Sequence, residues 1–426
     1  MKKTYVLVGT GGRSRLYYEA IAGDFKDCSQ LLAICDTNQT RMDYANRILH
    51  EKFNYPILPS YKNNQFDDMI RKHQPDIVIV TSIDRTHHHY IVRAMELGCD
   101  VITEKPMTID IEKLKIIFDA IERTGRKLRV TFNYRYAPHS TKMRELIMKG
   151  TVGNVHSVHF EWLLDTQHGA DYFRRWHRDK KNSGGLLVHK STHHFDLINF
   201  WLGTTPELVF AQGALMFYGK ENAEKRGEAR PYYRTTGVKE AEKDPFAIDM
   251  ESSEGLNDLY YKAEHEDGYL RDRCVFDDGI SIEDTLSVLV RYKNKAMLTY
   301  SLNAYMPWEG FRVAINGDKG RIEMLVVESS YVNADGQKDH EGVVKSKTIK
   351  VFPMFGKPYD VDINEAAGGH GGGDPVLLND LFGTPEPDPF ERAASHVDGA
   401  MSILTGIAAN QSIHSELPVK IDELMI

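Results

Sequence analysis

The chain has 426 residues, a formal net charge of −8, 41% hydrophobic residues and 27% charged residues. This composition is typical of a soluble globular protein, and the length favours two domains. The net negative charge argues against a nucleic-acid surface, because phosphate binding needs clustered positive charge. No apolar run approaches the roughly 20 residues of a membrane span. Four cysteines without a CxxC pair fit a reducing, cytoplasmic compartment.

Residues 1–135 alternate between short apolar runs and segments with helical spacing. The first apolar run lasts only about five residues before it reaches glycines, so it predicts a strand rather than a signal peptide. The expected strands are 4–8, 31–36, 76–82, 100–104 and 127–132, and the expected helices are 14–25, 39–53, 86–98 and 110–125. This alternation predicts a parallel sheet covered by helices on both faces.

Beyond Tyr136 the pattern changes to a period of two, as in 153–164 and 284–305. We therefore expect a second α/β domain over 136–426, built on a large, mostly antiparallel open sheet. A polar, charged insert at 219–278 interrupts it and is a lid, a loop bundle or a partner contact. Near the end, a glycine-rich loop at 365–375 precedes a helix expected over 390–413.

The segment GTGGRS places Gly9, Gly11 and Gly12 between the first strand and the first helix. This is the dinucleotide fingerprint with Ser14 at its third glycine position, and Arg13 beside it. Asp36 ends the second strand, where a carboxylate accepts hydrogen bonds from ribose hydroxyls and repels a 2′-phosphate. The pattern predicts a Rossmann domain that binds NAD. Two alternatives stay open: Asp36 caps the next helix, or Arg41 weakens the preference for NAD.

Several motifs give the chain a family resemblance: GTGGRS, SIDRTH at 82–87, TEKPMT at 103–108 and FNYRYAP at 132–138. Together with the opening strand they resemble the glucose–fructose oxidoreductase, inositol dehydrogenase and MocA family. The resemblance covers the first domain and the start of the second, but not the insert. It implies hydride exchange between a nicotinamide and a carbohydrate or cyclitol hydroxyl, with Lys105 as the active-site lysine.

The position of Lys105 suits that chemistry. It follows a parallel strand at the edge where α/β ligands bind, and an ammonium stabilises an alkoxide that forms as hydride leaves. The resemblance places Asp84 and His87 near the nicotinamide ribose, and Asn133 and Arg135 end the next strand at the same crevice. The expected cofactor residues are Gly9, Gly11, Gly12, Arg13, Ser14, Asp36, Ser82, Asp84, His87, Glu104, Lys105 and Asn133.

In the segment GGLLVHKSTHHFDLINFWLG (184–203), His189, His193 and Asp196 are spaced i, i+4, i+7. A helix that begins near His189 would put all three on one face, with His194 pointing away. Three interpretations compete: a metal site, an acid–base site and a structural cluster. The resemblance favours His193 as the acid–base residue. His189 takes the place of the family's aspartate, so it is expected to bind substrate or relay a proton, with Lys190 as a second cation.

The segment HGADYFRRWHR (168–178) is rich in residue types that bind sugars. Tyr172 and Trp176 have rings that stack on a pyranose, and Arg175 can hold hydroxyls or a carboxylate. His370 and Asp374 lie on the glycine-rich loop. These residues predict a polyhydroxylated substrate, either acidic or glycosidic.

The leading hypothesis is an NAD-dependent oxidoreductase acting on a hydroxyl of a sugar, glycoside, sugar acid or cyclitol, without a tightly bound metal. One alternative keeps NAD bound and uses transient oxidation to eliminate or cleave a glycosidic group. Another is a regulator that binds NAD without turnover. Because an open sheet face usually needs covering, we expect a homo-oligomer, a dimer or a tetramer.

Overall fold

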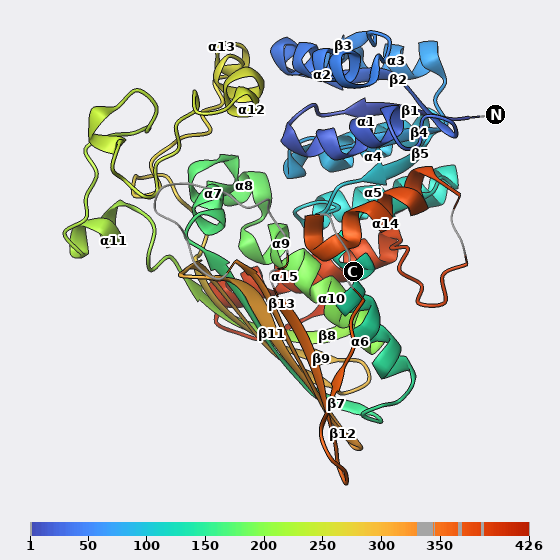
Figure 1. The fold of residues 1–426 in the computed structure, drawn as a ribbon, viewed down its shortest axis with the longest axis vertical. Helices are drawn as coiled ribbons and strands as arrows, with labels where there is room; N and C mark the ends of the chain where they lie inside the picture. The colour runs from blue at the N-terminus through green and yellow to red at the C-terminus, as the bar shows by residue number, and fades with distance from the viewer. Residues whose placement is uncertain (1, 330–343, 345, 365–368, 385–386, 426) are drawn as a thin grey trace.

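The structure is a computed structural model that describes residues 2–329, 344, 346–364, 369–384 and 387–425. Two sheets lie at opposite ends of the molecule, with helices between them (Figure 1). Part of the expected glycine-rich loop, 365–368, lies outside the described residues. Within the described chain, no helix combines the length and apolar character needed to cross a bilayer.

The first domain is a parallel, doubly wound sheet in the order β3-β2-β1-β4-β5-β6. Its strands are β1 (Lys3–Val8), β2 (Ser29–Asp36), β3 (Ser60–Lys62), β4 (Ile77–Val80), β5 (Asp100–Thr103) and β6 (Leu128–Val130). Its helices are α1 (Arg15–Ala22), α2 (Gln39–Phe53), α3 (Phe66–His73), α4 (His87–Glu96) and α5 (Ile111–Thr124). The strand order reverses between β1 and β4, and ligands bind at such a switch point. The predicted Rossmann architecture is confirmed.

The second domain is built on a sheet in the order β14-β13-β12-β11-β7-β10-β9-β8-β15. Its strands are β7 (Val155–Asp165), β8 (Pro206–Ala214), β9 (Thr285–Tyr292), β10 (Met297–Met306), β11 (Glu309–Gly317), β12 (Gly320–Ser329), β13 (Ser346–Pro353), β14 (Tyr359–Val361) and β15 (Val419–Lys420). Among the described strands of this second sheet, only β7 and β10 pair in parallel. The predicted mostly antiparallel sheet is confirmed.

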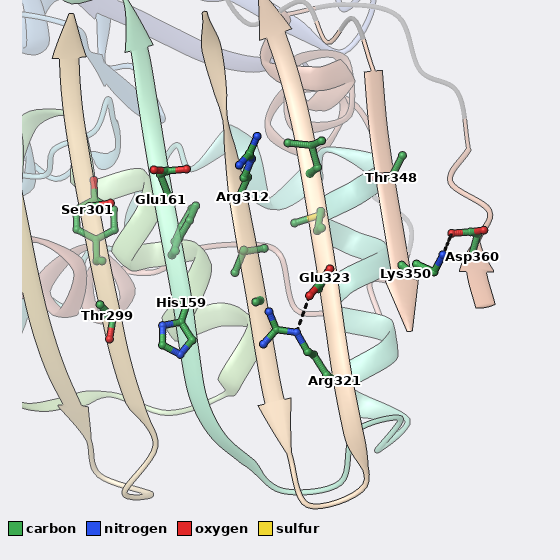
Figure 2. A pocket seen from close by; sticks show the side chains of 16 residues that line it. His159, Glu161, Thr299, Ser301, Arg312, Arg321, Glu323, Thr348, Lys350 and Asp360 are labelled. Atoms are coloured by element: carbon green, nitrogen blue, oxygen red, sulfur yellow. Dashed lines mark hydrogen bonds and ion pairs between the residues drawn. The ribbon is translucent and has the colours of Figure 1, made fainter. Parts of the chain in front are cut away.

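Within the described residues, helices cover one face of this sheet and leave the other open (Figure 1). They are α6 (Pro138–Met148), α7 (His168–Arg174), α8 (Lys180–Ser183), α9 (Leu186–His189), α10 (Ser191–Leu202), α15 (His396–Ser415) and α16 (Ile421–Leu424). Buried and exposed residues alternate along β9, as a sheet covered on one face requires. Figure 2 shows the open face, where a cavity of about 610 Å³ is bordered by His159, Glu161, Arg312, Arg321 and Lys350.

Two segments of the second half return to the first domain. Helix α14 (Gly369–Phe382) packs on the nucleotide sheet, where Phe382 contacts Tyr5 at 5.2 Å between ring centroids. The insert contains α11 (Lys220–Lys225), α12 (Glu254–Leu256) and α13 (Glu264–Asp267). In Figure 1, α12 and α13 lie beside α2, and hydrogen bonds join them.

Two predicted helices differ from the structure. The helix expected over 390–413 begins only at His396, because Ser395 forms a capping box with Asp398. The helix expected to start near His189 is divided, since α9 ends at His189 and α10 begins at Ser191. His189 and His193 therefore do not share one helix face.

Candidate active site

The glycine loop after β1 has the backbone geometry that the fingerprint predicts. Gly9 has φ of 91°, and a Cβ on it would lie 2.5 Å from the backbone nitrogen of Ser82. Ser14 is buried and its hydroxyl donates to the Gly11 carbonyl at 2.6 Å, so it closes the turn. A Cβ on Gly11 would meet no atom closer than 4.0 Å, whereas the Gly12 N–H already donates to the Tyr260 hydroxyl at 2.8 Å. The loop therefore fits a dinucleotide pyrophosphate, which needs a close backbone approach.

Asp36 lies beside this loop at the carboxyl end of β2. Its carboxylate accepts hydrogen bonds from the backbone and hydroxyl of Thr10, at 2.5 and 3.0 Å, and from the backbone of Asn38 at 2.9 Å. Helix α2 is capped by Asn38, not by Asp36. The half-buried carboxylate thus stands between the glycine loop and α2, where an adenosine ribose would meet it.

Lys105 follows β5 and points toward the second domain. Its ammonium lies 3.5 Å from the carbonyl oxygen of His189. Burial lowers the pKa of Lys105 to about 8, although the carboxylates of Glu104 and Asp84 oppose the shift. The neighbouring positive charge of Lys190 lowers it further. A lysine with this pKa changes its charge close to physiological pH.

His189 is paired with a carboxylate from the other domain. Its Nδ1 lies 2.5 Å from Oδ2 of Asp84, and both residues are buried. Burial raises the pKa of Asp84 and lowers the pKa of His189, and the charge of Lys105 favours the deprotonated form of both. The sequence placed a histidine where the family has an aspartate; the fold supplies the missing carboxylate from the nucleotide domain.

His193 lies on α10 among aromatic rings. Its ring centroid is 5.0 Å from that of Tyr134 and 6.2 Å from that of His370, and its Nδ1 has no hydrogen-bond partner within the described residues. Burial, together with Lys105 and Lys190, holds its pKa well below the usual value. The imidazole is therefore neutral at pH 7, and its Nδ1 is available for a hydrogen bond.

The predicted sugar-binding residues gather around His189. The ring centroids of Tyr172 and Trp176 lie 5.5 and 5.9 Å from that of His189, and His177 lies closer, at 4.3 Å. Arg175 is half-buried beside them, and its positive charge lowers the pKa of His189. The aromatic and cationic side chains thus border the same site as the histidines.

A chain of polar contacts joins the glycine-rich segment that contains His370 to the glycine loop after β1. His370 Nδ1 lies 3.0 Å from Asp374, and Asn133 donates to the other oxygen of Asp374 at 2.7 Å. Arg13 lies 4.0 Å from Asp374 and donates to Glu104 at 2.5 Å. Asn133 and Glu104 therefore stabilise this wall of the site by binding other side chains, Asp374 and Arg13.

The structure bears on three sequence-based interpretations. Arg135 does not face the crevice, because it is buried in a bidentate pair with Asp196 at 2.5 and 2.7 Å. Asp196 is thereby unavailable to the metal set considered with His189 and His193. In the described part of the chain no cluster of three or more His, Cys, Asp or Glu is arranged to hold a metal. The ring nitrogens of His87 lie 2.8 and 2.9 Å from the carbonyls of Pro106 and Ser82, which favours support of the Lys105 loop over a ribose contact.

Two buried carboxylates were missed from sequence. Tyr134 donates to Glu328 at 3.0 Å, and His168 lies 2.7 Å from Glu309. Burial and the nearby Glu309 raise the pKa of Glu328 to about 7. A signal was present, since inward and outward residues alternate along β12 and Glu328 occupies an inward position in line with Met324.

Both halves of the chain match models of one family. The model described as the NAD-binding Rossmann fold of the oxidoreductase family matches residues 3–132, and that of its C-terminal alpha/beta domain matches 144–421. The chain is 36% identical to the putative oxidoreductase YteT of Bacillus subtilis, over 99% of this chain and 98% of that protein. It is 25% identical to a myo-inositol 2-dehydrogenase of Thermotoga maritima, over 94% and 93% of the two chains.

A solved structure shares the fold across its whole length. The WlbA dehydrogenase from Bordetella pertussis, in complex with NADH and UDP-GlcNAcA, aligns with a TM-score of 0.64 at 19% identity, covering 99% of both chains. The two-domain architecture agrees with these matches. The chain belongs to the glucose–fructose oxidoreductase, inositol dehydrogenase and MocA family of oxidoreductases.

Proposed function

We propose that the protein is an NAD-dependent dehydrogenase that acts on a hydroxyl of a sugar, glycoside, sugar acid or cyclitol. One observation carries this proposal. Lys105 of the nucleotide domain and the His189–His193 segment of the second domain meet in one site, with 3.5 Å between the Lys105 ammonium and the His189 carbonyl. A cation and a neutral imidazole beside one hydroxyl are the groups that alcohol oxidation needs.

NAD would be held by the glycine loop and Asp36, and when bound it supplies the hydride acceptor. The protein's own residues handle the proton and the charge. Lys105 stabilises the alkoxide oxygen, and His193 accepts the hydroxyl proton at a ring nitrogen. Asp84 fixes the orientation of His189, which contacts a substrate hydroxyl together with Arg175. Tyr172 and Trp176 exclude water and pack against the sugar ring.

The proposal is tested with a panel of sugars, glycosides, sugar acids and cyclitols, while nicotinamide absorbance is recorded. Lys105→Ala and His193→Ala should each lower turnover by roughly 10²–10⁴-fold, because each removes one group from the proton transfer. NAD affinity should change little, since neither residue touches the glycine loop. Near-normal turnover in Lys105→Ala would overturn the mechanism. Release of NADH in proportion to product separates this function from one that retains its cofactor.

A further inference from the structure

Helix α13 of the insert places a carboxylate at the start of α2. Glu266 of α13 accepts hydrogen bonds at 2.7 Å from the backbones of Gln39 and Thr40 and from the Thr40 hydroxyl. Lys62 donates to the same carboxylate at 3.0 Å. One side chain of the insert thus takes four donors at the start of α2, three residues after Asp36.

The four donors make a complete anion site. Backbone N–H groups at a helix N-terminus, a hydroxyl and an ammonium are a set that binds phosphate or carboxylate. Burial opposes ionisation of Glu266, but the hydrogen bonds from Gln39 and Thr40 lower its pKa to about 2. Glu266 is therefore a charged carboxylate at neutral pH, and it fills the site from within the chain.

Asp267 neutralises the remaining cation. Arg41 pairs with it at 2.5 Å and is 8% exposed. An arginine near the end of β2 commonly accommodates the 2′-phosphate of NADP. Here the insert holds that arginine, because Asp267, 226 residues away in sequence, pairs with it. Arg41 is therefore not available to bind a 2′-phosphate and so to weaken a preference for NAD.

The remainder of the insert fixes α13 in this place. Arg47 of α2 pairs with Glu254 at 2.7 Å and Asp258 at 2.5 Å, and Asn38 donates to the Ala263 carbonyl at 2.9 Å. The Tyr260 hydroxyl accepts a hydrogen bond from the Gly12 backbone at 2.8 Å. The insert therefore lies along the adenosine side of the predicted cofactor site, from the glycine loop to α2.

We propose that Glu266 and Asp267 act as a built-in anion that occupies the place a 2′-phosphate needs, and so exclude NADP. This inference rests on the proposed function, because it assumes that a nicotinamide dinucleotide binds at Asp36. Asp36 repels the 2′-phosphate of NADP. Glu266 in addition competes with that phosphate for the four donors at the start of α2. This competition gives this part of the insert a role outside the three that the sequence left open: a selectivity element.

The test is calorimetric titration of the full-length protein with NAD and with NADP. Glu266→Ala should strengthen NADP binding by at least about 10-fold, because it frees charge-assisted donors, while NAD affinity stays within about 3-fold. Glu266→Gln keeps the shape that docks the insert and should give a smaller gain in the same direction. Glu251→Gln, an exposed change in the same insert, should alter neither affinity.

Unchanged NADP affinity in both Glu266 variants, with NAD binding retained, would overturn the inference. So would a wild-type protein that binds NADP as tightly as NAD; in that case the dehydrogenase proposal still stands. If Glu266→Ala weakens the binding of both cofactors, the insert has undocked in that variant. The NADP affinity of Glu266→Gln then decides. A wild-type protein that binds neither dinucleotide contradicts the proposed function itself.

Discussion

At the scale of single residues, the site gathers ionisable groups whose environments oppose their charged forms. Lys105 has a pKa lowered to about 8, and His193 is held neutral by burial and by two lysines. The same burial raises the pKa of Asp84. Groups with pKa values shifted in this manner gather at catalytic sites, where protons must move near neutral pH.

The charge of Lys105 should set a limb of the pH profile. Because its pKa is lowered to about 8, the ammonium is present below that pH and is lost above it. Reduction of the ketone product, which needs the cation, should therefore decline as pH rises through about 8. In Lys105→Arg the guanidinium stays charged, so the decline should disappear even if the rate is lower overall. The kcat/KM for reduction, measured from pH 6 to about pH 10 in both proteins, checks this; an identical decline in the variant would assign it to another group.

The role of Asp84 has two interpretations, which lead to different predictions. The family resemblance places it near the nicotinamide ribose, whereas the structure pairs it with His189 at 2.5 Å. Asp84→Asn should lower kcat by at least about 10-fold, because the imidazole loses its carboxylate partner, and leave the Kd for NAD nearly unchanged. Stopped-flow turnover and cofactor titration measure the two quantities. A weaker NAD affinity with normal kcat would instead support the ribose contact.

At the scale of elements, a buried ion pair joins two segments that the sequence keeps far apart. Arg135 follows β6 and Asp196 lies on α10, and both side chains are at most 3% exposed. Asp196→Ala should lower the free energy of unfolding by about 3 kcal/mol, since it leaves a buried guanidinium with Asp398 as its remaining partner. Urea denaturation measures the change.

A matched control comes from the surface pair of Arg123 and Asp119, in which Asp119 is 65% exposed. Asp119→Ala should cost less than about 1 kcal/mol, because water screens that pair. The double variant Arg135→Met, Asp196→Leu should recover most of the loss, since apolar residues of similar size replace both charges. Equal losses of unfolding free energy in Asp196→Ala and Asp119→Ala would show that the buried pair stabilises the fold no more than a surface pair does.

Local sequence patterns predicted most elements of the first domain and the residues that lie at their ends, but not β3 or α3. Gly9 and Asp36 lie at the carboxyl ends of buried strands of a parallel sheet, where such strand ends meet at one edge, so spacing locates them. Lys105 lies at the same edge, and the family resemblance singled it out. The partners of Asp84 and Arg135 were not predictable in this way. Each contact joins residues at least 61 positions apart and depends on how the two domains pack, which no local pattern encodes.

At the scale of the whole molecule, segments from the second half of the chain pack on the first domain. Helix α14 returns from the second half to cover the nucleotide sheet, and α13 of the insert returns to its adenosine edge. The division expected at 135 and 136 therefore describes the order of the chain better than the packing, because later segments complete the first domain. Closure from both sides places the site between two rigid sheets, which suits the precise positioning of a substrate hydroxyl.

The open face of the larger sheet remains to be covered. Leu289 and Met297 are 52% and 59% exposed on neighbouring strands of this sheet, and Phe355, just beyond β13, is 99% exposed. The cavity in Figure 2 lies on the same face and contains cations from β11 and β13, Arg312 and Lys350. Exposed apolar residues flanked by charged ones are typical of a protein interface. The homo-oligomer expected from the sequence would place a second copy of the chain on this face.

Light scattering should therefore give a mass of two or four chains of 48.6 kDa. Charge reversal at the face, Arg312→Glu with Lys350→Glu, should shift the mass toward one chain. The new carboxylates would oppose the acidic side chains of the same face on the second copy, Glu161 and Glu323, and opposed like charges cost several kcal/mol. Lys72→Glu, an exposed change on the first domain, should leave the mass unaltered. A monomeric wild-type protein would contradict this expectation. An oligomer that survives the double reversal would place the interface on another surface and leave this face to a different partner.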